Sequence, residues 1–106
     1  MDLGVLYLAV PSLTATAAPA LALMTGGIAL AASAEVPVVI VDVMRGGPST
    51  GIPAKSEQSD LSFAVSGLHG DAPRLVLAPN SIADCIATTQ WAVHLAEALQ
   101  TAAIVL

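Results

Sequence analysis

Val36-Pro-Val-Val-Ile-Val-Asp-Val-Met44 is the most informative stretch of the chain. It is β-branched and continuously apolar apart from Asp42, which is typical of a strand buried on both faces of a parallel sheet. Pro37 fits only among the first residues of such a strand, where no ladder hydrogen bond is needed. Asp42 lies near the carboxyl end of the predicted strand, and we interpret it as tying down the following loop by hydrogen bonds.

Further strands and helices alternate around this stretch. Weaker or shorter apolar runs predict strands at residues 12–17, 74–78 and 102–106. Three helices are predicted, at residues 20–34, from Ser59 or Asp60 to near Gly67, and from Ser81 to about Thr101. Ser81 and Asp84 form a start signal for the last of these helices. Strand and helix fit residues 1–10 equally well. The alternation predicts an α/β fold, a three-layer parallel sheet with helices on both faces.

Composition limits the possible classes of protein. A length of 106 residues favours one domain, and with only 3% aromatic residues the core must be built from Ala, Val, Leu and Ile. The apolar fraction of 56% suggests a surface that something else covers. The net charge is −5 and the cations are only Arg45, Lys55 and Arg74, which excludes a nucleic-acid binder. Cys85 is the only cysteine, so the chain has neither an intrachain disulfide nor a four-cysteine iron–sulfur site. A reducing, cytoplasmic location is expected.

Residues 3–34 carry no charge, and this run is long enough for a membrane span. Pro11, Pro19 and the pair Gly26-Gly27 interrupt it, and no basic residue flanks it to set an orientation. A strand followed by a buried helix explains the same residues. We favour that interpretation over a membrane span, and we expect no membrane partner.

The loop that follows the central strand reads Arg45-Gly-Gly-Pro-Ser-Thr-Gly-Ile-Pro53. Ligands in parallel sheets bind beyond the carboxyl ends of the strands, which is where this loop falls. Prolines stiffen it, Arg45 offers a planar fork that matches a carboxylate, and Ser49 and Thr50 add hydroxyl donors. These residues predict a site for a small carboxylic acid. The alternative is a turn-rich loop whose arginine is only solvated.

Several segments together resemble a known family. The stretch at residues 36–53 continues into Lys55-Ser-Glu-Gln-Ser-Asp-Leu61, and Thr14-Ala-Thr16 precedes it. Leu68-His-Gly-Asp-Ala-Pro-Arg74, Leu77-Ala-Pro79 and Ala83-Asp-Cys85 follow. In this combination the chain resembles, over residues 12–106, the pyrimidine-binding domain of 2-oxoacid:ferredoxin oxidoreductase alpha subunits.

The resemblance implies a fold, a reaction and partners. The fold would be the thiamine diphosphate-binding fold, with residues 1–106 forming one partial pyrimidine-binding domain that is incomplete at both ends. Such enzymes convert a 2-oxoacid to acyl-CoA on thiamine diphosphate with Mg²⁺ and pass electrons through iron–sulfur clusters to ferredoxin. The beta subunit would be the partner. Arg45 would hold the substrate carboxylate, with Ser49 and Thr50 beside it. No catalytic, cofactor-binding or metal-binding residue is assigned in this chain.

The chain also departs from that family. Ala54 stands where 2-oxoglutarate-using members often carry a threonine that contacts the distal carboxylate. Ala17-Ala-Pro-Ala20 replaces Ser-Gly-Pro-Gly, and the family's Tyr-Pro-Ile-Thr-Pro-Ser segment and its activating glutamate have no counterpart here. We therefore expect the fragment alone to be inactive. A stand-alone anion-binding α/β module without catalysis is the alternative.

Other polar residues receive structural interpretations. Glu57 and Asp60 are interpreted as capping the short helix, with fixing of Lys55 and Arg45 as the alternative. Cys85 is interpreted as buried packing on the last helix. The large aromatic Trp91 is a candidate subunit contact.

Overall fold

A sheet of four parallel strands organises residues 12–106, the part of the chain that the computed structural model describes. The strands are β1 (Ser12–Ala17), β2 (Val38–Val43), β3 (Arg74–Leu77) and β4 (Ala102–Val105), and their order across the sheet is β1-β2-β4-β3. All neighbouring strands pair in parallel, so β2 has a partner on each side. Val38, Val39 and Ile40 of β2 are buried, which confirms the predicted strand that is buried on both faces of a parallel sheet.

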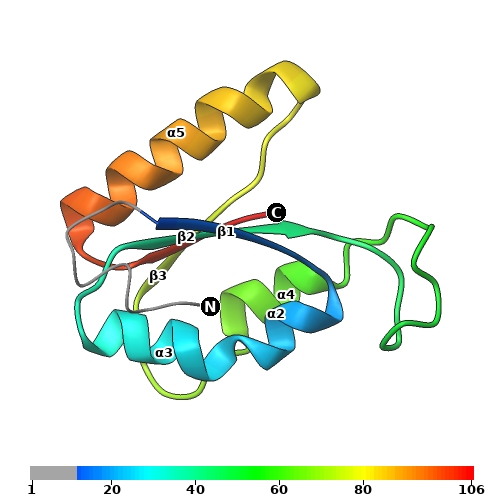
Figure 1. The fold of residues 1–106 in the computed structure, drawn as a ribbon, viewed down its shortest axis with the longest axis horizontal. Coiled ribbons are helices and arrows are strands. Elements are labelled where there is room, and N and C mark those ends of the chain that lie inside the picture. The colour runs from blue at the N-terminus through cyan, green and yellow to red at the C-terminus, as the bar shows by residue number, and fades with distance from the viewer. Residues whose placement is uncertain (1–11) are drawn as a thin grey trace.

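Helices cover both faces of the sheet. On one face lie α2 (Pro19–Leu23), α3 (Thr25–Ser33) and α4 (Asp60–Ser66), and α5 (Ile82–Leu99) lies on the other (Figure 1). The predicted three-layer α/β architecture is therefore confirmed. Residues 1–10, for which strand and helix fitted equally well, lie outside the described residues.

Each face of the sheet has its own apolar core, and alternate residues of β2 contribute to each. Val38 and Ile40 pack with Leu21, Ile28 and Ala64 on the face covered by α2, α3 and α4. Val39 packs with Ala92, Ala96, Ala103 and Val105 beneath α5. Small alanines let the helices approach the sheet closely, as the low aromatic content predicted. By the same alternation, the side chain of Asp42 points to the α4 face.

The helix predicted at residues 20–34 is wrong in one respect, because it is divided at Met24. The backbone N–H of Met24 donates to the Leu21 carbonyl, and the Thr25 hydroxyl donates to the Ala22 carbonyl at 3.0 Å. These local bonds end α2 and let α3 begin in a new direction. Gly26 and Gly27, both poor helix formers, follow at once and weaken the continuous helix further.

The other predicted boundaries hold to within a few residues. Ser81 is the N-cap of α5, and its hydroxyl accepts a hydrogen bond from the Asp84 N–H at 3.2 Å, as the start signal predicted. Gln100 ends the helix in the left-handed conformation with φ of 51°. β1 has the predicted bounds, and β2, β3 and β4 are slightly shorter than the apolar runs that predicted them.

Arg74, at the start of β3, joins the sheet to α4. Its Nε donates to the Ala64 carbonyl at 2.7 Å and its Nη2 donates to the Val65 carbonyl, both in the last turn of α4. Its Nη1 also donates to the Ala72 carbonyl at 3.2 Å. A cation at a helix C-terminus satisfies carbonyls that have no partner within the helix. This arginine therefore has a structural role.

Within residues 12–106, none of the helices combines the length and the apolar character that crossing a bilayer requires. The uncharged run is instead occupied by β1, α2 and α3 over its described part, as we favoured.

Candidate functional site

The loop between β2 and α4 folds back on itself at the carboxyl edge of the sheet. Gly46 forms an antiparallel bridge with Ile52, and its N–H donates to the Lys55 carbonyl at 2.7 Å. The Gly47–Pro48 peptide bond is cis, and the Gly51 N–H donates to the Pro48 carbonyl. A Cβ at position 46 would lie 3.1 Å from the Ile52 Cβ, so a larger residue here would force Ile52 to move by a few tenths of an ångström. The backbone of the loop thus has a defined shape.

Arg45 is half-buried at the base of this loop. Its Nη1 donates to the carbonyls of Gly46 at 3.3 Å and Ser49 at 3.1 Å. Within the described part of the chain, the Nε and Nη2 donors of Arg45 have no hydrogen-bond partner. One nitrogen therefore fixes the guanidinium to the loop, and the edge formed by the other two can accept a planar anion.

Ser49 and Thr50, the other predicted substrate-binding residues, are exposed on the same loop. Ser49 adopts a positive φ of 49°, and it contacts Arg45 through its backbone carbonyl. The two hydroxyls make no hydrogen bond to any described residue. The structure therefore places Ser49 and Thr50 on the same loop as Arg45, and their role in binding stays a prediction.

Asp42 does not have the role that its position suggested. The carboxyl group is buried, with 1% of the residue exposed, and neither oxygen accepts a hydrogen bond from any described residue. Burial and the negative charge of Asp60 raise the pKa of Asp42, the nearby Ala18 N–H lowers it in part, and the net value is about 6. The prediction that Asp42 ties down the following loop by hydrogen bonds is wrong.

The predicted capping of α4 by Glu57 or Asp60 is also wrong. No side chain makes a cap hydrogen bond at the start of α4, and Asp60 Oδ2 is buried without a partner. Burial and the charge of Glu57 raise the pKa of Asp60, and the positive charge of Arg45 lowers it. Among the described residues neither carboxyl group forms an ion pair with Arg45 or Lys55, so the alternative, fixing of these two cations, stays a prediction.

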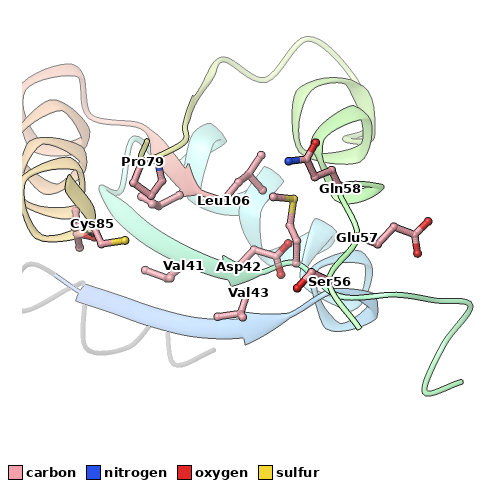
Figure 2. A pocket seen from close by; sticks show the side chains of 12 residues that line it. Val41, Asp42, Val43, Ser56, Glu57, Gln58, Pro79, Cys85 and Leu106 are labelled. Carbon is pink, nitrogen blue, oxygen red and sulfur yellow. Dashed lines mark hydrogen bonds between the residues drawn. The ribbon is translucent and has the colours of Figure 1, made fainter. Parts of the chain in front are cut away.

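A cavity of about 590 Å³ lies at the carboxyl edge of β2 and β4 (Figure 2). Its walls come from residues 41–44 at the end of β2, from loop residues 56–58, from Val105 and Leu106, and from Cys85 and Thr89 on α5. None of the three cations of the chain lines it. Cys85 is exposed here, so its interpretation as buried packing is wrong. Periodicity could not reveal this cavity, because its walls are distant in the sequence.

Trp91 is 55% exposed on α5, and its ring stacks on His94 with centroids 5.4 Å apart. Both residues lie outside the cavity lining. The role of Trp91 as a subunit contact stays a prediction.

The fold and the loop sequence together define the class of the protein. Residues 6–106 match the family described as "Pyruvate flavodoxin/ferredoxin oxidoreductase, thiamine diP-bdg", so the chain belongs to this family of thiamine diphosphate-binding domains. The resemblance to 2-oxoacid:ferredoxin oxidoreductase alpha subunits is thereby confirmed.

Individual relatives are similar over nearly the whole chain. It is 42% identical over 104 residues to the 2-oxoglutarate oxidoreductase subunit KorA of Mycobacterium tuberculosis, covering 98% of this chain and 16% of that protein. It is 47% identical over 95 residues to the 2-oxoglutarate synthase subunit KorA of Archaeoglobus fulgidus, covering 90% of this chain and 28% of the relative.

A solved structure shows the same fold. The 2-oxoglutarate:ferredoxin oxidoreductase of Magnetococcus marinus, which has 2-oxoglutarate, coenzyme A and succinyl-CoA bound, superposes with a TM-score of 0.92 at 50% identity. The match covers 97% of this chain and 18% of that one. The chain thus corresponds to less than a third of the length of each of these relatives.

Proposed function

We propose that this chain contributes the substrate-carboxylate loop to a 2-oxoacid:ferredoxin oxidoreductase as part of its alpha subunit. The assembled enzyme would oxidatively decarboxylate a 2-oxoacid to acyl-CoA, with iron–sulfur clusters passing electrons to ferredoxin. The beta subunit would be its partner, and residues 1–106 would form one partial pyrimidine-binding domain.

One observation carries the proposal. Arg45 is anchored through Nη1 at the carboxyl edge of the inner strand, while its Nε–Nη2 edge has no partner among the described residues. A carboxylate pairs with that edge through two parallel hydrogen bonds, which fix its orientation as well as its position. Ser49 and Thr50 would add hydroxyl donors from the same loop. An oriented oxoacid is the contribution that such a loop can make to catalysis.

The described residues do not fit the magnesium–diphosphate end of thiamine diphosphate. No group of three or more His, Cys, Asp or Glu side chains that could hold a metal ion occurs among residues 12–106. We propose that other segments of the assembled enzyme bind the metal and the diphosphate, together with CoA and the clusters. The part proposed for this chain is substrate binding.

The test is Arg45→Gln in the assembled enzyme. Losing a charge-assisted bidentate contact should raise KM for the oxoacid roughly ten-fold or more, with thiamine diphosphate affinity unchanged. Lys55→Gln removes an exposed cation from the same loop and serves as the matched control, with kinetics like those of the wild type. Oxoacid kinetics that are unchanged in Arg45→Gln would reject the proposal.

A second candidate is a stand-alone anion-binding module. It is favoured by the open edge of Arg45, which needs no other chain to form. In this case the chain alone would bind pyruvate or 2-oxoglutarate saturably without thiamine diphosphate, and Arg45→Gln would abolish the binding. Calorimetric titration distinguishes the two candidates.

A further inference from the structure

Two backbone carbonyls hold the guanidinium of Arg45 among the described residues. Its Nη1 donates to the Gly46 carbonyl at 3.3 Å and to the Ser49 carbonyl at 3.1 Å. Gly46 is the next residue in the chain, so its carbonyl moves with Arg45 and restrains the side chain only weakly. Ser49 lies four residues further along, and its carbonyl is therefore the contact that fixes the guanidinium relative to the rest of the loop.

Ser49 lies in a tight turn. The Gly51 N–H donates to the Pro48 carbonyl at 3.0 Å, which makes Ser49 and Thr50 the two central residues of this turn. Of these two, Ser49 has a positive φ of 49° and Thr50 does not. This combination is typical of a type II′ turn, which prefers glycine at its first central position. The backbone of Ser49 thus adopts a conformation that residues with a Cβ usually avoid.

The backbone of Ser49 has a defined contact and its side chain has none. Its carbonyl accepts from Arg45, whereas its hydroxyl is exposed and makes no hydrogen bond to any described residue. An uncommon backbone conformation persists where the surrounding contacts require it, and it is often found at functional sites. At position 49 the contact that depends on the backbone is the hydrogen bond to the guanidinium.

We propose that Ser49 is a positioning residue for Arg45, whose guanidinium it orients through its backbone carbonyl, independently of the Ser49 hydroxyl. The inference rests on the proposed function, because it takes Arg45 as the substrate anchor. It adds the residue that sets the direction of the open Nε–Nη2 edge. The backbone preference of residue 49 should therefore govern the affinity for the oxoacid.

Two substitutions of Ser49 separate the backbone from the hydroxyl. Ser49→Thr keeps the hydroxyl but branches at Cβ, which disfavours a positive φ, whereas Ser49→Gly loses the hydroxyl and adopts a positive φ freely. In the assembled enzyme, Ser49→Thr should raise KM for the oxoacid roughly three- to ten-fold, because the binding-competent orientation of Arg45 becomes less populated. Ser49→Gly should keep KM within roughly two-fold of the wild type. A role of the hydroxyl alone predicts the opposite ranking.

Comparing KM with kcat separates positioning from a folding defect. A preparation that is partly misfolded contains fewer active molecules, which lowers the apparent kcat and leaves KM unchanged. Ser49→Thr should instead raise KM while kcat stays within about two-fold of the wild type. Ser66→Thr makes the same substitution at an exposed serine of α4, and its KM and kcat should equal those of the wild type.

Arg45→Gln provides the reference for both proposals. If Ser49 acts through Arg45, Ser49→Thr should not raise KM further in the Arg45→Gln background. If Arg45→Gln alone leaves KM unchanged, the proposed function fails and the inference fails with it. If Arg45→Gln raises KM but Ser49→Gly raises it as much as Ser49→Thr or more, the inference alone is overturned. An undiminished effect of Ser49→Thr in the Arg45→Gln background would overturn it too.

Discussion

Nη1 of Arg45 lies 3.1 Å from the carbonyl oxygen of Ser49, four residues further along the same loop. The guanidinium that we propose as the substrate anchor therefore also closes the turn that displays it. Since the same nitrogen donates to Gly46, the shape of the loop and the orientation of the guanidinium form one structural unit. A change that deforms the backbone at residues 46–49 should also move the open edge of Arg45.

Gly46→Ala tests this unit directly. The added Cβ would lie 3.1 Å from the Ile52 Cβ, so we expect a loss of stability of about 1–3 kcal/mol from overpacking, together with weaker oxoacid binding. Gly26→Ala is the control, because its Cβ would meet nothing within 4 Å and the position is helical. It should instead stabilise by about 0.5–1 kcal/mol in urea unfolding. Equal effects of the two substitutions would contradict the prediction.

Asp42 makes the stability of the fold depend on pH. Its pKa is 3.8 in an ordinary environment and about 6 in the folded chain, so the folded state binds the proton more tightly. The free energy of unfolding should therefore fall as pH rises from about 4 to about 6 and then level, by up to about 3 kcal/mol for this group. Asp42→Asn should flatten this slope in denaturation series, whereas Asp71→Asn should keep it. If the free energy of unfolding still depends on pH in the same way after Asp42→Asn, the dependence comes from other groups.

Ser81→Ala removes the N-cap of α5. The hydroxyl accepts from the Asp84 N–H at 3.2 Å, so its loss should destabilise by about 1 kcal/mol. Ser62→Ala removes an exposed hydroxyl within α4 and should change stability by less than about 0.5 kcal/mol. Thermal denaturation followed by circular dichroism compares the two, and similar shifts would argue against the cap.

Ala54 bears on the choice of oxoacid. It is exposed on the loop that we propose binds the substrate, and its methyl group can donate no hydrogen bond to a second carboxylate. We expect Ala54→Thr in the assembled enzyme to raise kcat/KM for 2-oxoglutarate relative to pyruvate, by roughly ten-fold for one added hydrogen bond to a charged group. Ala54→Val adds the same bulk without a hydroxyl and should not change the ratio. An equal change of this ratio in Ala54→Thr and Ala54→Val would show that the shape of the side chain, and not its hydroxyl, determines the preference for 2-oxoglutarate.

Most of the architecture could be predicted because local and tertiary preferences agree. The β-branched run of β2 is buried on both faces, and Ser81 with Asp84 starts α5 where the spacing indicated. The break at Met24 escaped prediction because it depends on hydrogen bonds from Met24 and Thr25 to carbonyls one turn earlier. Residue composition does not specify such bonds.

The site was predictable only in part. Arg45 could be placed at the ligand edge, since the residue that follows an inner parallel strand must emerge there. The isolation of Asp42 and the exposure of Cys85 could not be predicted, because each depends on how segments distant in the sequence meet at that edge. A buried aspartate is usually hydrogen-bonded, so the general rule gave the wrong expectation for Asp42.

Two donors of Arg74, Nε and Nη2, connect β3 at the edge of the sheet to α4, and α4 begins only two residues after the cavity-lining Gln58. A helix of seven residues is too short to persist without tertiary support. The contacts with Arg74 of β3 therefore help to stabilise α4, although β3 is separated from β2 by β4 in the sheet. Loss of the Arg74 side chain should therefore make the carboxyl edge of the sheet next to α4 less ordered, although Arg74 itself does not line the cavity.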